Sequence, residues 1–184
     1  DDSSTDSTMT TTEKKGTTSE TEQFGKGDIG IVNYALTLEY LEAAFYQQAA
    51  KQVAGLSADQ KKLIKELGEN EQEHVDALVA TAKKLGGTPV KKPGVDFGTA
   101  FNDKATFLKV ANVFEDTGVS AYNGAAPMIE SKDLLATAGG IVQVEARHAA
   151  AIRYAAGEDP APEAFDPTLT EDEVLAAVQP FVKS

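Results

Sequence analysis

The two histidines of the chain each follow a glutamate by three residues, and this spacing suits metal binding. The pairs are Glu71 with His74 and Glu145 with His148. Residues three apart on a helix point in nearly the same direction, so a carboxylate and an imidazole at this spacing can bind one ion together. We therefore expect each Glu-x-x-His pair to contribute two ligands to a metal site.

A second spacing also occurs twice, because a glutamate precedes a tyrosine by seven residues in Glu39/Tyr46 and in Glu115/Tyr122. Each copy comes before one Glu-x-x-His pair, so the stretches 39–74 and 115–148 look like one helical hairpin used twice. Two hairpins related by an approximate two-fold axis would bring such residues together at the centre of a bundle. One glutamate from each of two helices, with a Glu-x-x-His pair from each of the other two, is a ligand set that binds two iron or manganese ions. The predicted ligands are Glu39, Glu71, His74, Glu115, Glu145 and His148.

Each of these glutamates lies within a stripe of apolar residues at a spacing of three and four, which on a helix faces the core. The stripe Leu67, Glu71, His74, Leu78 is an example. Burying a single carboxylate costs several kcal/mol, and four buried together also repel one another. Two divalent cations would balance four glutamates and leave the histidines as neutral ligands. A helical interaction module without metal would leave these groups uncompensated.

Two points of the site have alternative interpretations. Glu39 and Glu42 both lie on the core stripe of the first helix, and either can be the ligand from that helix. Glu39 is preferred because its spacing to Tyr46 matches that of Glu115 to Tyr122, which leaves Glu42 as a supporting or bridging carboxylate. The two tyrosine hydroxyls can either reach a ligand carboxylate or belong to ordinary core aromatic residues.

The elements that must position these residues are five helices. Capping residues, glycines and prolines predict helices over 28–55, 57–86, 102–126, 131–157 and 170–180. Residues 88–100 carry two prolines and two glycines and no helical pattern, whereas the other connections within the bundle are short. The fold class is therefore all-α: a four-helix bundle of two helical hairpins joined by one long crossover, with a short C-terminal helix. The expected domains are a disordered tail over 1–24, the bundle over 25–157 and a C-terminal extension over 158–184.

Composition excludes several classes of protein. The net charge of −12 argues against binding to nucleic acid or to an anionic membrane surface. The sequence contains no cysteine, so iron–sulfur clusters and thiolate zinc sites are excluded. No apolar run is long enough to span a bilayer.

The first 22 residues are rich in Ser and Thr and have no apolar periodicity. Such a segment cannot bury enough apolar surface to offset the entropy cost of ordering, so we expect it to be disordered. It is either a flexible terminus or a tether left after removal of an export signal. The second interpretation predicts an exported protein, extracytoplasmic or secreted.

Residues 25–183 resemble the ferritin-like family that includes the desiccation-related proteins. The stretches that carry the resemblance are NYALTLEYLEAAFY, ENEQEHV, EDTGVSAYNGAAP, VEARHAAAIR and EVLAAVQPF. The resemblance implies the same six ligands by position, and it implies export for many members. Unlike many rubrerythrins, the chain has no Cys-x-x-Cys module, so electrons must come from elsewhere.

Two functions are compatible with this pattern. The first is an oxidoreductase in stress protection that acts on dioxygen, peroxide or ferrous iron at a di-iron or di-manganese centre, as a ferroxidase, peroxidase or catalase-like enzyme. The second is a non-catalytic metal-binding or desiccation-protection protein whose ions are structural. Assembly into a homo-oligomer is compatible with both.

Overall fold

The computed structural model describes residues 23–183. The predicted disordered tail falls outside them, except for its last two residues. Of these, Phe24 differs from the prediction, because its ring centroid lies 5.9 Å from that of Tyr34 and its carbonyl oxygen accepts a hydrogen bond from Asn33. The packed domain therefore begins before residue 25.

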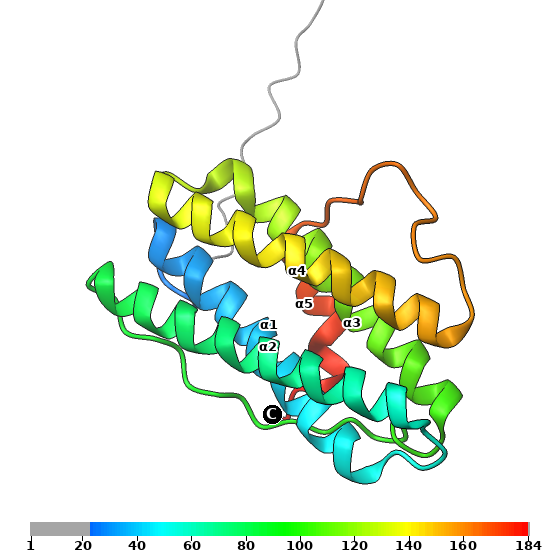
Figure 1. The fold of residues 1–184 in the computed structure, drawn as a ribbon. Helices are drawn as coiled ribbons and strands as arrows, with labels where there is room; N and C mark the ends of the chain where they lie inside the picture. Colours follow the sequence, from blue (N-terminus) through cyan, green and yellow to red (C-terminus); the bar gives the residue numbers. More distant parts are fainter. Residues whose placement is uncertain (1–22, 184) are drawn as a thin grey trace, which may run out of the picture.

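Four long helices form two antiparallel hairpins (Figure 1). The first hairpin pairs α1 (Gly27–Gln52) with α2 (Ala58–Lys84), and the second pairs α3 (Lys104–Ala125) with α4 (Lys132–Ala156). A short helix, α5 (Glu171–Val178), packs against α3. The all-α prediction of a four-helix bundle with one long crossover and a short C-terminal helix is confirmed. Among residues 23–183, no helix combines the length and the apolar character needed to cross a bilayer.

The helix ends follow the predicted capping chemistry. Ser57 Oγ accepts a hydrogen bond from the backbone N–H of Gln60, and the Gln60 side chain accepts one from the backbone N–H of Ser57, which closes a capping box. Thr170 and Glu173 form the same arrangement at α5. Gly157 ends α4 at a φ of 80°, a left-handed conformation that glycine adopts at little cost.

Asp28 does not have the role that its position suggested. Asp28 is the capping residue type at the start of the predicted helix 28–55, whereas that helix begins at Gly27 with Lys26 as its N-cap. The Asp28 carboxylate accepts hydrogen bonds from the backbone N–H groups of Glu130 and Ser131, at 2.9 and 2.8 Å. It therefore connects the start of α1 to the start of α4, and thus one hairpin to the other.

The crossover (residues 85–103) and the C-terminal extension cover the first hairpin and α3. In the crossover, Phe97 packs on Phe45 of α1, and Val95 pairs with Val182 near the end of the chain. On α3, a Cβ atom at Gly124 would lie 2.1 Å from the backbone oxygen of Leu169, so only glycine permits this close approach. Together with the neighbouring helices, these segments leave most residues of α1 buried.

Candidate metal centre

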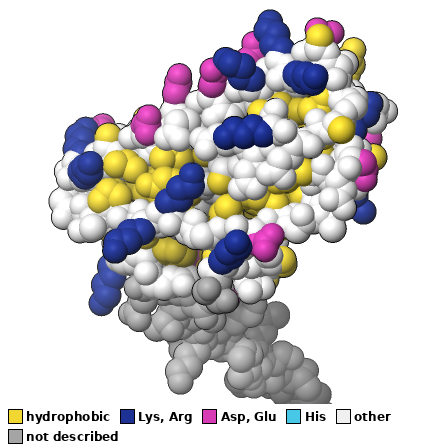
Figure 2. All heavy atoms as spheres, turned by 90° about the horizontal axis from the view of Figure 1, so that it is seen from below, with side chains coloured by type: hydrophobic (Ala, Val, Ile, Leu, Met, Phe, Trp, Pro, Cys, Tyr) yellow, Lys and Arg dark blue, Asp and Glu magenta, His cyan; other side chains and the backbone are white. Residues whose placement is uncertain are grey.

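Five glutamates and two histidines lie in one buried layer between the four long helices. The glutamate side chains are at most 2 % exposed, and they are Glu39, Glu42, Glu71, Glu115 and Glu145. His74 is 8 % exposed and His148 is 4 % exposed. On the face shown in Figure 2, Lys and Arg side chains surround apolar patches and no histidine is visible. The layer is thus a cluster of buried polar side chains within an apolar core.

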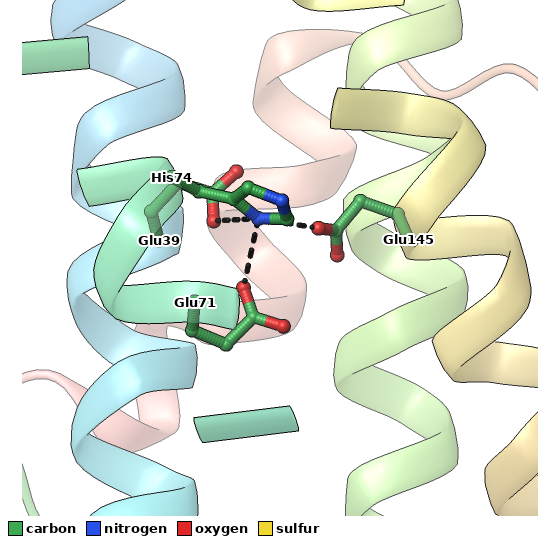
Figure 3. A group of neighbouring side chains, drawn as sticks. All are labelled: Glu39, Glu71, His74 and Glu145. Carbon is green, nitrogen blue, oxygen red and sulfur yellow. Dashed lines mark hydrogen bonds and ion pairs between the residues drawn. The ribbon is translucent and has the colours of Figure 1, made fainter. Parts of the chain in front are cut away.

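The first group of potential ligands surrounds the imidazole of His74 (Figure 3). Its Nδ1 atom lies 3.2 Å from an oxygen of Glu39 on α1 and 3.3 Å from one of Glu71, one turn earlier on α2. An oxygen of Glu145 on α4 lies 3.0 Å from the same nitrogen. One ligand atom from each of these four residues lies within 4.8 Å of the others. The group is compact enough to share one metal ion.

The second group surrounds His148 on α4. Its Nδ1 atom lies 2.7 Å from Glu71 Oε1 and 3.5 Å from Glu115 Oε2, which comes from α3. With Glu145, these residues again offer four ligand atoms within 4.8 Å of one another. Glu71 and Glu145 belong to both groups, so they occupy the positions of bridging ligands between two metal positions.

Several atoms of this layer lack the partners that buried polar atoms normally have. Glu71 Oε1, Glu115 Oε2, both oxygens of Glu145 and Nδ1 of His148 have no aligned hydrogen bond. The 2.7 Å contact between His148 and Glu71 is close, but it does not have hydrogen-bond geometry. Cations that accept the lone pairs of these oxygens and nitrogens would satisfy them, so the residues fit a metal-binding role.

In the metal-free layer, bound protons neutralise part of the negative charge of the carboxylates, which cations would otherwise balance. Burial raises the pKa of Glu39 to about 7, against the opposing effect of a hydrogen bond with His74. Burial, followed by the negative charge of Glu71, raises the pKa of Glu145 well above its usual value. Burial lowers the pKa of His74, but Glu145, Glu39 and Glu71 outweigh it and raise that pKa to about 12. Loading with metal must therefore displace protons.

Glu42 adds a fifth carboxylate, and Gly118 supplies the space for it. A Cβ atom at Gly118 would lie 3.2 Å from Glu42 Oε1 and 3.3 Å from Glu145 Oε2. Glu39 and Glu115 are 76 residues apart in the sequence, and the same offset pairs Glu42 with Gly118. One hairpin therefore contributes the extra carboxylate, and the other contributes the gap that it fills. Burial, followed by the charge of Glu145, raises the pKa of Glu42 well above its usual value.

The two tyrosine hydroxyls contact the carboxylates of the opposite hairpin. Tyr46 on α1 donates to Glu115 Oε1 on α3, and Tyr122 on α3 donates to Glu39 Oε1 on α1 at 2.5 Å. In each glutamate the other oxygen, Oε2, faces a histidine Nδ1. The structure thus favours the interpretation in which the hydroxyls reach ligand carboxylates, and each tyrosine leaves one oxygen directed toward the centre.

A surface depression of about 370 Å³ between α2 and α4 leads to both histidines, which contribute to its lining. Asn70 also lines it, and its Nδ2 atom lies 3.1 Å from His148 Nε2. A side-chain amide can turn to exchange its nitrogen and oxygen, so the Asn70 side-chain oxygen can accept a hydrogen bond from the Nε2–H group of His148 when Nδ1 is the ligand. Sequence reasoning missed Asn70. One sequence feature could have indicated it: a polar residue, Asn70, stands directly before Glu71, whereas the apolar Val144 stands directly before Glu145 in the second hairpin.

Residues 27–158, more than two thirds of the chain, match the family model of the ferritin-like domain. The chain belongs to the ferritin-like domain family. No match was found among curated proteins. The ferritin-like domain contains α1 to α4 and every residue of the buried layer, so the candidate metal centre lies at the middle of the family's own fold.

Within the ferritin-like domain, the structure brings together all the residues that the sequence singled out. The six predicted ligands meet in one layer, Glu42 lies among them, and Tyr46 and Tyr122 contact two of them. That these residues bind metal stays a prediction. The choice of Glu39 over Glu42 is also untested, although Glu39, and not Glu42, belongs to a four-residue group.

Proposed function

We propose that the chain binds two iron or manganese ions and acts as an oxidoreductase on dioxygen, peroxide or ferrous iron in stress protection. The observation that carries this proposal is the pair of overlapping ligand groups that share Glu71 and Glu145. Carboxylates combined with imidazoles suit both iron and manganese.

Each proposed metal position has its own pair of terminal ligands. Glu39 and His74 belong to one position, and Glu115 and His148 belong to the other. Four of the buried carboxylates would balance the charge of two divalent cations. Glu42 is the additional carboxylate, placed to support Glu145 or to add a ligand where the two positions meet.

The surrounding residues hold this arrangement in place before any ion arrives. Tyr122 fixes Glu39 and Tyr46 fixes Glu115, each through the oxygen directed away from the histidine. Asn70 restrains the ring of His148 from its outer side. Fixing the partners of ligand side chains in this way sets ligand orientation and contributes to metal affinity.

Iron or manganese, when bound, would supply the one-electron chemistry that dioxygen and peroxide require. The protein would contribute a buried site, ligands from all four helices and access for small polar molecules through the depression beside His74 and His148. The chain has no cysteine to carry electrons, so the electrons come from ferrous iron, from a second molecule of peroxide or from an external donor.

The alternative is a non-catalytic stress-protection protein in which the ions are structural. The observation in its favour is that the ligands come from α1, α2, α3 and α4, so bound ions would cross-link the whole bundle. Such cross-linking would stabilise the fold without turnover.

An activity assay on metal-loaded protein separates these possibilities. Protein reconstituted with Fe²⁺ or Mn²⁺ is mixed with dissolved oxygen or hydrogen peroxide, and consumption is followed with an oxygen electrode and a peroxide assay. The proposal predicts turnover that is lost in His148→Ala and retained in Glu69→Gln, which changes an exposed carboxylate on α2. Full metal content without consumption of either oxidant would favour the structural role. An absence of bound metal would refute both functions.

A further inference from the structure

The two ends of the bundle, on either side of the ligand layer, are filled differently. At one end Phe45 packs against four other phenylalanines with ring centroids 5.0 to 5.5 Å away, namely Phe97, Phe101, Phe107 and Phe114. At the other end lies a cavity of about 20 Å³ to whose open surface no polar atom contributes. This difference was not predicted from the sequence.

The cavity is lined by aliphatic residues at positions whose counterparts in the other hairpin are phenylalanines. The 76-residue offset that relates Glu39 to Glu115 also relates Ile31 to Phe107, Leu38 to Phe114 and Ala121 to Phe45. Ile31, Leu38 and Ala121 all line the cavity, while their three partners fill the aromatic end. The space therefore arises because, at these three pairs of positions, the residue at the cavity is smaller than its partner at the aromatic end.

The cavity lies directly beside the ligand layer. Ala35, four residues before Glu39, and Leu78, four residues after His74, line it from one helical turn away. Tyr122 contacts both the cavity and the ligand layer, because it lines the cavity while its hydroxyl donates a hydrogen bond to Glu39 Oε1. A molecule in the cavity would therefore lie beside a side chain that contacts a proposed ligand.

We propose that this cavity holds one molecule of dioxygen next to the metal centre. About 20 Å³ exceeds what a water molecule needs, but water also requires two to four polar partners, and apolar cavities stay dry and take up apolar guests. Dioxygen is apolar and small, whereas ferrous ions and peroxide would lose their hydration here without replacement. The two kinds of reactant then have separate approaches: polar species from the depression beside the histidines, and dioxygen from the cavity. The catalytic use of the bound gas rests on the proposed function.

The gas site can be tested without turnover in protein loaded with Zn²⁺, which is not redox-active. Dissolved dioxygen is paramagnetic and broadens the NMR signals of methyl groups that it approaches. In protein labelled at Ala and Leu methyls, we expect severalfold stronger broadening at Ala35 and Ala125 than at Ala111 and Ala49, their partners by the 76-residue offset. Leu56, 9 % exposed against 8 % for Ala35, controls for access from solvent. Equal broadening at both ends would overturn the proposal.

Variants that fill the cavity provide a second test of the dioxygen site. Ala121→Phe places at the cavity the side chain found at position 45, and Ala121→Leu is a smaller change if the first variant does not fold. We expect the extra broadening to disappear while the zinc content stays at the wild-type value. With Fe²⁺, the KM for dioxygen should rise severalfold at unchanged kcat. Unchanged KM in a filled variant would refute the supply role. Strong broadening without any oxygen consumption would support the gas site and refute the proposed oxygen chemistry.

Discussion

Replacing Gly118 with alanine separates the stability of the helix from the affinity for metal. The position lies inside α3, where alanine is favoured over glycine by about 1 kcal/mol. The added methyl would, however, lie 3.2 Å from Glu42 Oε1 and 3.3 Å from Glu145 Oε2, closer than ordinary contacts. Both carboxylates must then shift by a few tenths of an ångström.

Such a shift matters because metal–ligand distances tolerate changes of only about 0.2 Å. Disturbing groups that support ligands typically costs 10- to 100-fold in metal affinity, or about 1 to 3 kcal/mol. We therefore expect Gly118→Ala to weaken metal binding by one to two orders of magnitude, while the metal-free protein melts at the wild-type temperature or slightly higher.

Gly139→Ala is the matched control. Gly139 lies within α4, and a Cβ atom there would meet nothing within 4 Å, so this variant should gain helix stability and keep its metal affinity. Isothermal titration with Mn²⁺ and melting curves with and without metal measure both quantities. Equal affinities in the two variants would refute the role of Gly118 as the space for Glu42 and Glu145.

Further expected outcomes concern pH, the choice of ligand from α1 and the N-terminal segment. Metal-free protein should lose stability as the pH rises from about 4.5 to about 7, because burial raises the pKa of Glu39 from 4.5 to about 7 and the group favours the folded state only while it is protonated there, by at most about 3 kcal/mol. Metal-loaded protein should instead melt lower in mild acid, where protons compete with the ions, so a gap between the two melting temperatures that narrowed with rising pH would contradict this account. Glu39→Gln should reduce that gap more than Glu42→Gln, and the reverse order in melting curves would make Glu42 the ligand from α1. Deletion of residues 1–22 should leave melting temperature and metal content unchanged, since every residue of the buried layer lies within 23–183, and a drop of several degrees would show that the segment contributes to stability.

The features that the sequence predicted are those set by local chemistry. Capping at Ser57 and Thr170 depends on residues three positions apart, and the Glu-x-x-His pairs depend on a single helical turn. The polarity of the core stripes was enough to place all four long helices around one layer. These signals are contained within short stretches of chain, so one sequence suffices to find them.

The features that the sequence did not predict depend on how the hairpins meet. The tyrosines reach across to the opposite hairpin, and Asn70 on α2 contacts His148 on α4. Asp28 is a residue type typical of N-caps, yet its carboxylate accepts hydrogen bonds from backbone N–H groups about a hundred residues away. The cavity was missed because it arises from side-chain volumes at positions that are equally apolar in both halves.

Metal content across ligand variants tests the central claim most directly. Elemental analysis after reconstitution with Fe²⁺ or Mn²⁺ should give two ions per chain for the wild type. His74→Ala and His148→Ala should each lower occupancy, since each removes a ligand from one group, whereas Glu71→Ala should remove both ions because Glu71 belongs to both groups. Glu69→Ala, which changes an exposed carboxylate two residues away, should keep two. A wild-type protein without metal, or a Glu71→Ala variant that still binds two ions, would contradict the account.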